Sequence, residues 1–397
     1  PTLDKLAEKG ISFSKNYAAS SWTVPSFMSY FTSLYPSEHL VRNKFVSYEP
    51  DNKVLTNLEK LSPNVKTIAQ AFKKAGYRTG GFTGDAGVNS LFGYAQGFDT
   101  YTDEVAFGSM DNSREHAMDW LDEDSEKPFF MFFHGYDAHG QFSGVDDSYK
   151  PIFGEANEFE ITPTKQRDLR EESLENGEIL LSEEEVAAWN AWYDSKIFEA
   201  DARIATFLEE LEKRDLMENT IIVVISDHGT EIYEHRRFDH GYSLYNELIN
   251  VPLLITWPQL TIGEINDVQV RAIDLVPTLF EITQIPTDEI WESQIRGESL
   301  FPAITKEDAS NREVFSETDY RNYTHKRSVI DSEGWKYIFT LEDGTGEIYN
   351  LNDDPKEQHN LILEEKQRAS SMKEEVLAHM DRVGESPSDE WPIGCLP

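Results

Sequence analysis

The feature that most constrains the fold of this chain is an amphipathic helical segment followed directly by a run of apolar residues. Along residues 193–214, apolar side chains recur at helical spacing on one side, at Ile197, Ala200, Ile204, Phe207, Leu208 and Leu211. Residues 220–226 then read TIIVVIS, the strongest signal in the chain for a strand buried on both faces. A helix that leads into a fully buried strand is typical of α/β proteins, in which helices cover both faces of a parallel sheet.

The same alternation recurs elsewhere in the chain. Residues 67–75 (TIAQAFKKA) predict an amphipathic helix that stops at Gly76, and residues 77–83 predict the strand that follows it. Two further apolar runs, FFMFFH at 129–134 and VPLLITW at 251–257, predict buried strands. The sequence therefore predicts an α/β fold with a large, mostly parallel sheet sandwiched by helices.

Two segments depart from this alternation. Residues 143–185 are acidic and low in apolar periodicity, which indicates an insertion: either a lid near the site or, as the simpler interpretation, a solvated excursion. A large α/β domain is expected over 1–311, after which the chain changes character again, and a small α+β subdomain is expected over 312–397. Its predicted strands and helix are residues 327–330, 335–340, 347–349 and 364–382.

Charge and composition narrow the classes of partner. The chain carries 73 Asp and Glu against 36 Lys and Arg, a formal net charge of -37, and a surface this acidic repels nucleic acid and anionic membranes. Such acidity fits either a protein that works in high salt or one with very soluble acidic loops, and the frequent Lys favours the second. The single cysteine, Cys395, excludes an intrachain disulfide. No apolar run approaches the roughly 18 residues of a membrane span, so we predict no nucleic-acid partner and no membrane span.

Asp227 and His228 directly follow the most apolar strand, in the sequence Ser-Asp-His-Gly. In open α/β sheets ligands bind beyond the carboxyl ends of the strands, and both residue types bind divalent cations. The alternative is a simple turn closed by the Asp side chain. His235 and His240 stand in the loop that follows, where an imidazole can bind an anion or protonate a leaving group. Both are candidates for substrate binding; a solvated loop residue is the alternative, and it suits His235 better than His240.

Two other segments carry polar groups where ligands would bind. His134 and His139 lie in HGYDAH after the predicted strand at 129–134, and we place His139 in the site, with His134 as a strand cap. Near the N-terminus, Thr23 shortly precedes Pro25, which is suited to the first position of a helix. The N-terminus of a helix favours an anion and lowers the pKa of a hydroxyl, and a nearby metal would lower it further. Thr23 is therefore either a nucleophile or an ordinary N-cap.

Together these segments resemble the sulfatase family, in the right order and along nearly the whole chain. The opening PTLDKLAEKGISFSKNYAASSWTVPS is similar to the stretch that leads to the family's nucleophile, usually Cys or Ser followed by x-Pro-Ser-Arg. The family's successive landmarks are similar to TIAQAFKKAGYRTGGFTG, FFMFFHGYDAHG, VVISDHGTEIYEH, VPLLITWP, AIDLVPTLFEI and EIYNLNDDPKEQHNL. The resemblance implies the α/β fold of the alkaline phosphatase superfamily with a small C-terminal subdomain.

The resemblance also implies roles for individual residues. Thr23 falls on the nucleophile, which also contacts the metal, and Asp227 and His228 fall on metal ligands. His139 falls on a histidine that contacts the anionic group of the ester, and His240 on a position usually held by a basic Lys or His. One divalent ion is implied, Ca²⁺ first, with Mn²⁺ and Zn²⁺ as alternatives. The implied substrate is a small anionic ester: a sulfated sugar, an aryl sulfate or a phosphodiester.

Departures from the family pattern keep alternatives open. Thr23 cannot be oxidised to the formylglycine of sulfatases, the Arg that normally follows is Phe27, and the family's Lys-x-His reads Asp-Ala-Gly at 85–87. The family's first strand, with one or two further Asp ligands, would precede Pro1. The expected function is metal-dependent hydrolysis of a sulfate or phosphate ester. The alternatives are a phosphodiesterase, phosphonate hydrolase or phosphoglycerol-type transferase of the same superfamily, and a catalytically inactive homologue that binds an anion.

Overall fold

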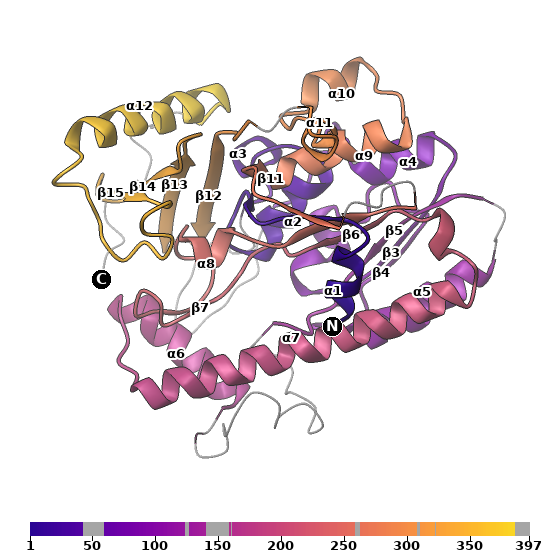
Figure 1. The fold of residues 1–397 in the computed structure, drawn as a ribbon, viewed down its shortest axis with the longest axis horizontal. Helices are drawn as coiled ribbons and strands as arrows, with labels where there is room; N and C mark the ends of the chain where they lie inside the picture. The colour runs from indigo at the N-terminus through magenta and orange to yellow at the C-terminus, as the bar shows by residue number, and fades with distance from the viewer. Residues whose placement is uncertain are drawn as a thin grey trace.

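The computed structural model describes residues 1–42, 59–123, 127–139, 159, 161–258, 263–307, 310–321 and 323–385. A large α/β region lies beside a smaller antiparallel sheet that is covered by the last helix (Figure 1). This division matches the order of elements along the chain, because the antiparallel strands come last.

The large domain contains a four-stranded and a three-stranded sheet. The first has the order β10 (Glu264–Asn266), β1 (Ile11–Phe13), β9 (Leu253–Thr256) and β6 (Ile222–Ile225). The second has the order β4 (Thr100–Thr102), β3 (Arg78–Phe82) and β5 (Phe129–Phe133). Only β9 runs antiparallel to its neighbours; the other pairings in these two sheets are parallel. The predicted α/β fold with a mostly parallel sheet is therefore confirmed.

Two strands are less buried than the sequence predicts. Residues 129–134 and 220–226 are expected to be buried on both faces, yet every residue of β5 and β6 is partly exposed. Within the described ranges β5 pairs only with β3 and β6 only with β9, so each is an edge strand. β9, which is paired on both edges, is buried at every position as predicted. An apolar run indicates that a strand packs against a core, but it does not indicate how many other strands pair with it in the sheet.

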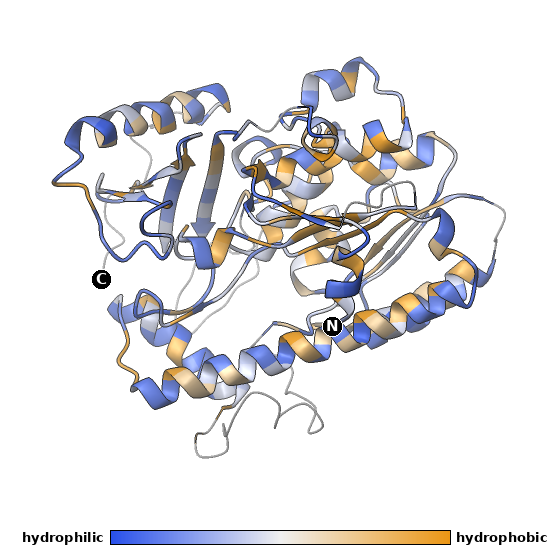
Figure 2. Ribbon diagram, viewed as in Figure 1, coloured by the Kyte–Doolittle hydropathy of each residue, from blue (hydrophilic) through white to orange (hydrophobic). Residues whose placement is uncertain are grey.

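Helices cover the strands with their apolar faces. The main apolar core contains residues of α2 (Thr23–Thr32), α4 (Ile68–Lys74) and α9 (Leu275–Thr283), with Phe132 and Val223 of the sheets packed against it. On another side of the molecule, α7 (Glu183–Glu212) runs beside α5 (Met110–Glu123) and α1 (Thr2–Ala7) (Figure 1). Figure 2 shows β6 and neighbouring strands as hydrophobic and the long helix as alternating. Each large apolar side chain buried in this way stabilises the fold by about 1.5–3 kcal/mol.

The predicted insertion contains regular structure. The described part of 143–185 includes α6 (Pro163–Asn176), which packs against β8 (Phe238–Asp239), the hairpin partner of β7 (Glu231–Ile232). α7 begins ten residues before the predicted start because Ser182 and Glu185 form a capping box. The solvated interpretation was wrong for this part, since a helix that packs on a strand is not a loop. The remaining short strands and α-helices of the domain are β2 (Asn16–Tyr17), β11 (Val270–Arg271), α3 (Pro36–His39), α8 (Asn246–Ile249), α10 (Glu289–Gln294) and α11 (Phe301–Ile304).

The small C-terminal sheet is an antiparallel meander. It has the order β12 (Val314–Tyr320), β13 (Thr324–Ile330), β14 (Trp335–Thr340) and β15 (Gly346–Asn350), and α12 (Lys366–Arg382) packs on it. β12 is largely hydrophilic in Figure 2 and is nevertheless buried. Its charged side chains are paired: Glu317 accepts from the backbone and hydroxyl of Ser37 in α3, and Asp319 pairs with Arg327 of β13. The contact between Glu317 and Ser37 joins the subdomain to the large domain.

Candidate active site

Two hydroxyl groups of α2 hold the loop that follows β6. Ser26 Oγ donates to the carbonyl oxygen of Asp227 at 2.6 Å, and Tyr30 Oη donates to that of Ser226 at 3.2 Å. Residues three and four apart share one face of a helix, so the side chain of Thr23, one turn before Ser26, faces the same loop. The N-terminus of α2 is thereby fixed against the carboxyl end of β6.

Thr23 is the first residue of α2, and its side chain does not cap the helix. The sequence places the start at Pro25, but the helix begins two residues earlier with Trp22 at the N-cap. Because of this shift, the Thr23 hydroxyl is available to the loop after β6: Oγ1 lies 3.2 Å from Nε2 of His228. Thr23 is 7% exposed, so the hydroxyl is shielded from bulk water. The interpretation of Thr23 as an ordinary N-cap is excluded.

His228 presents its lone pair to Thr23 and Asp227. Its Nδ1 lies 2.7 Å from the carbonyl oxygen of Gly229, a contact that requires a proton on Nδ1 and assigns the lone pair to Nε2. Nε2 lies 3.2 Å from Thr23 Oγ1 and 3.4 Å from Asp227 Oδ2. Burial lowers the pKa of His228 below its ordinary value, although the Asp227 charge opposes this shift. The ring is therefore neutral at neutral pH, the form that binds a cation.

The atoms Thr23 Oγ1, Asp227 Oδ2 and His228 Nε2 form a donor set that fits one divalent cation. Their separations of 3.2 and 3.4 Å are close to those between adjacent ligands that each lie ~2.0–2.5 Å from a shared ion. The hydrogen bond from His228 Nδ1 to a carbonyl oxygen is the outer contact that metal-bound histidines usually make. Three donors leave coordination positions for water or for the oxygens of an ester.

Two further histidines of the predicted site lie next to this group. The ring centroid of His240 is 4.2 Å from that of His228 and 5.2 Å from that of His139. Burial, together with the neighbouring charge of His240, lowers the pKa of His139 well below its ordinary value. The structure thus brings together five of the six residues chosen from sequence, namely Thr23, His139, Asp227, His228 and His240. Their individual roles stay predictions.

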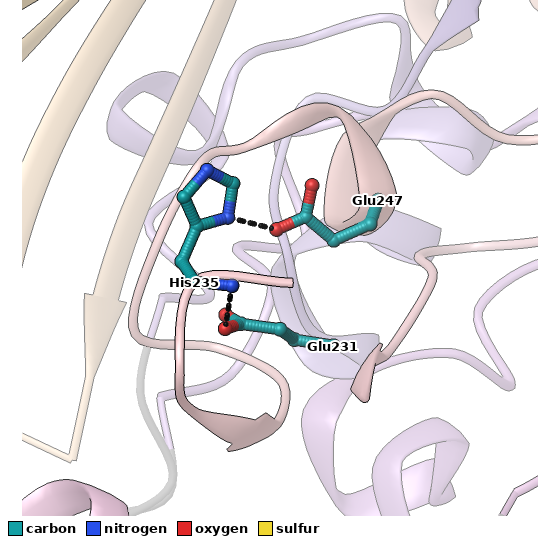
Figure 3. A group of neighbouring side chains, drawn as sticks. All are labelled: Glu231, His235 and Glu247. Carbon is teal, nitrogen blue, oxygen red and sulfur yellow. Dashed lines mark hydrogen bonds and ion pairs between the residues drawn. The ribbon is translucent and has the colours of Figure 1, made fainter. Parts of the chain in front are cut away.

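His235, the sixth, lies in a different group of side chains (Figure 3). Its Nδ1 is 2.8 Å from Glu247 Oε1, its Nε2 is 3.1 Å from the carbonyl oxygen of Glu357, and its ring stacks on Tyr245. The ligand-type atoms of Glu231, His235 and Glu247 lie within 4.8 Å of one another, as a cation site would require. However, both ring nitrogens face oxygen acceptors, so both carry protons and neither can bind a cation. The substrate-binding role of His235 stays a prediction.

The ion pair between His235 and Glu247 should make stability depend on pH. Burial alone would lower the pKa of His235, but the hydrogen bond and charge of Glu247 raise it from 6.5 to about 9. The pair therefore stabilises fully below pH 6.5, and this contribution is lost as the pH rises through about 9. We expect the unfolding temperature to fall across this range and His235→Gln to remove that part of the decline in thermal denaturation. An equal decline in the variant would contradict the assignment.

Gly87 is a contact of Thr23 that the sequence did not reveal. A Cβ atom on Gly87 would lie 2.5 Å from Thr23 Cγ2, so the threonine methyl occupies the space next to residue 87. Gly87 stands where the resemblance expects the His of Lys-x-His, and its N–H donates to Tyr136 Oη at 2.7 Å. Thr23 and Gly87 both depart from the family pattern, and the two residues pack against each other. No local pattern marks such a pair, because the two residues meet only in the folded chain.

Helix α7 supplies a buried cation beside these histidines. Lys196 is 0% exposed, and burial lowers its pKa to about 8. Its charge contributes to the lowered pKa of His139. One turn earlier, burial raises the pKa of Tyr193 to about 12, and the Asp227 charge contributes to that shift. Charges on α7 and in the site therefore influence one another, although the spacing of α7 in the sequence indicated only core packing.

Comparison with protein families gives two matches. The family model described as Sulfatase matches residues 1–285, and that described as N-sulphoglucosamine sulphohydrolase, C-terminal, matches residues 233–383. Delta 4,5-hexuronate-2-O-sulfatase of Bacteroides thetaiotaomicron is 24% identical over 396 residues, covering 92% of this chain and 79% of that protein. The arylsulfatase K proteins of Gallus gallus and Homo sapiens match 46% of this chain and only 35% of their own length.

Solved structures share the fold. A protein solved in complex with its substrate D-glucosamine-2-N,6-O-disulfate has a TM-score of 0.72 at 19% identity, covering 100% of this chain and 94% of that chain. The phosphonate monoester hydrolase of Agrobacterium radiobacter has a TM-score of 0.74 at 18% identity, covering 96% of this chain and 91% of that chain. At these identities the likeness shows the fold alone. Among the described helices, none combines the length and apolar character of a bilayer span.

Proposed function

Because the chain belongs to the sulfatase family, we propose that it is a metal-dependent hydrolase that cleaves a sulfate or phosphate ester with Thr23 as nucleophile. The observation that carries this proposal is the convergence of Thr23 Oγ1 with Asp227 and His228 at the N-terminus of α2. Orphan N–H groups and the helix dipole favour an anion at such a position. A relative is named for a sulfated hexuronate, and a protein of the same fold was solved with a disulfated glucosamine. A sulfated sugar is therefore the first substrate class that we propose.

The described residues can divide the reaction between them. The Thr23 hydroxyl gives its proton to water, and Oγ1 attacks the sulfur or phosphorus atom, forming a covalent ester while the bond to the alcohol oxygen breaks. His139, neutral because its pKa is lowered well below the ordinary value, binds an anionic oxygen through an N–H group. His240 is then the proton donor to the departing alcohol, a role that contributes about 10²–10⁴-fold. Water releases the acid from Thr23 in a second displacement. A bound divalent ion would lower the pKa of the Thr23 hydroxyl and neutralise ester oxygens.

Phosphorus chemistry is the second candidate, because residue 23 is a threonine. Its hydroxyl cannot become the formylglycine of sulfatases, and the methyl group packs against Gly87, where the resemblance expects a basic side chain. A phosphonate monoester hydrolase has the same fold. Thr23, Phe27 and Asp85 stand where a sulfatase would hold its aldehyde, Arg and Lys.

A matched panel of 4-nitrophenyl sulfate, 4-nitrophenyl phosphate and bis(4-nitrophenyl) phosphate tests the proposal. We expect turnover of at least one ester with Ca²⁺, Mn²⁺ or Zn²⁺, and a loss on the order of 100-fold or more after chelation, because a metal ion supplies several kcal/mol of transition-state stabilisation. The ratio of kcat/KM values decides between sulfate and phosphate esters. A folded protein that binds the esters and cleaves none would be an inactive anion-binding homologue, and the proposal would fall.

A further inference from the structure

The imidazole of His240 is paired with a buried carboxylate, which in turn lies near a buried guanidinium. Its Nδ1 forms an ion pair with Asp239 Oδ1, and Arg170 Nη1 lies 3.7 Å from Asp239 Oδ2. Asp239 is 1% exposed and Arg170 is 5% exposed. Withdrawing charges from water costs several kcal/mol each, and apolar residues of similar size often stabilise a core as well or better. A buried Arg–Asp–His array is therefore not explained by packing alone.

The backbone around this array is strained. Asp239 has a φ of +85°, a conformation that costs a non-glycine residue about 1–3 kcal/mol and that clusters at functional sites. The next residue but one, Gly241, is packed so closely against Tyr320 that a Cβ atom would lie 2.5 Å from its ring. Thr318 Oγ1 also donates to the Gly241 carbonyl oxygen. These contacts fix the chain on both sides of His240, so its imidazole has little freedom to move.

Arg170 comes from a segment that the sequence marked as an insertion. Helix α6 carries it, and Leu169 of the same helix packs with Trp189 and Phe238. Ser173 Oγ, one turn after Arg170, accepts the backbone N–H of Phe238 at 3.0 Å. The helix is thus attached to strand β8, directly before Asp239. This attachment places the guanidinium near Asp239 Oδ2, whereas His240 Nδ1 pairs with Asp239 Oδ1.

We propose that Asp239 and Arg170 are positioning residues for His240, with Asp239 holding Nδ1 and Arg170 holding Asp239, so that Nε2 is the ring nitrogen presented to the ester. The inference rests on the proposed function. In the described ranges no residue forms a hydrogen bond with Nε2, and the ring lies beside His228 and His139. During the reaction the Nε2–H bond breaks and an O–H bond forms on the departing alcohol as its bond to sulfur or phosphorus breaks. The Nδ1–H group stays paired with Asp239, and the imidazole ring is neutral after the transfer.

Esters with different leaving groups test this inference. A nitrophenolate can depart without a proton, whereas an alkoxide needs a proton donor. In Asp239→Asn we expect kcat for an alkyl or phenyl ester to fall about 100-fold or more, within the range that a proton donor supplies. The same variant should lose less than about tenfold on the 4-nitrophenyl ester. Arg170→Met should show the same selectivity with a smaller loss, and Arg170→Lys should recover part of it. KM and bound metal per chain should stay near the wild-type values.

A double-mutant cycle separates positioning from general damage. In a His240→Gln background, Asp239→Asn should cause little further loss, because its effect acts through the ring. Equal losses for both leaving groups, or full additivity with His240→Gln, would overturn the inference. If Asp239→Asn does not fold, Arg170→Met and Arg170→Lys decide the question by the same comparison. Failure of the wild-type protein to cleave any ester would instead overturn the proposed function, so the two failures are distinguishable.

Discussion

Thr23→Ala should abolish turnover of every ester that the wild-type protein cleaves, with a loss on the order of 10⁴-fold or more in kcat, as removal of a nucleophile usually gives. Oγ1 of Thr23 is the hydroxyl oxygen placed 3.2 Å from His228 Nε2. The nearest hydroxyl on the same helix face, that of Ser26, donates to the Asp227 carbonyl oxygen and holds the loop. Wild-type-like turnover by Thr23→Ala would refute the assignment.

The fold should survive this substitution. Thr23 does not cap α2, so the change removes no capping hydrogen bond, and the lost methyl group should cost only about 1 kcal/mol. Unchanged circular dichroism and an unfolding temperature within a few degrees of the wild type would show this. Thr23→Ser is the matched control: it keeps the hydroxyl and should keep measurable turnover.

Gly87→Ala tests the position of Thr23 by changing the residue that packs against it. The new Cβ atom would lie 2.5 Å from Thr23 Cγ2 and 2.7 Å from Thr23 Cβ, so Thr23 must move away from its present place. We expect lower turnover than in the wild type, with Asp227 and His228 unchanged in sequence. Full activity would show that the contact between residues 23 and 87 does not set the position that Thr23 needs for turnover.

Local sequence was sufficient to predict the position of most of the helices and strands that were proposed. The predicted helix at 67–75 is found at Ile68–Lys74, because Thr67 and Gln70 cap its start and Gly76, at a φ of +93°, ends it. The strand at 335–340 has the predicted bounds. Such signals lie within a few residues of one another, so the chain itself carries them.

The parts that sequence did not reveal depend on contacts between distant segments. Whether an apolar strand is central or at an edge depends on its neighbours, which is why β5 and β6 are more exposed than expected. The strand end at Asp227 and the helix start at Thr23 were each recognised, but the side chain that joins them, Ser26, was not. The sequence likewise did not indicate a role for Arg170, because that role depends on its contact with Asp239.

Two of the carboxylate–histidine clusters are candidates for the cation site, and substitution distinguishes them. One contains Asp227 and His228 beside the Thr23 hydroxyl, and the other contains Glu247 and His235. In the first, the histidine nitrogen next to the carboxylate has a lone pair, because the other nitrogen carries the proton. In the second, both ring nitrogens face oxygen acceptors and the ring is protonated. Only the first can bind a cation without first losing a proton.

Asp227→Asn should therefore remove the bound metal and, with it, turnover, by at least about 10³-fold, since the variant loses both the anionic ligand and the activation of Thr23. Added metal at 100 times its Kd should stabilise the wild-type protein by about 2.7 kcal/mol and should leave the unfolding temperature of the variant unchanged. Glu247→Gln is the matched control: it neutralises a carboxylate beside His235, and metal content measured by elemental analysis should stay at the wild-type level. The opposite pattern, with metal lost from Glu247→Gln and retained by Asp227→Asn, would place the cation in the cluster of Figure 3 and would leave Thr23 without its activating partner.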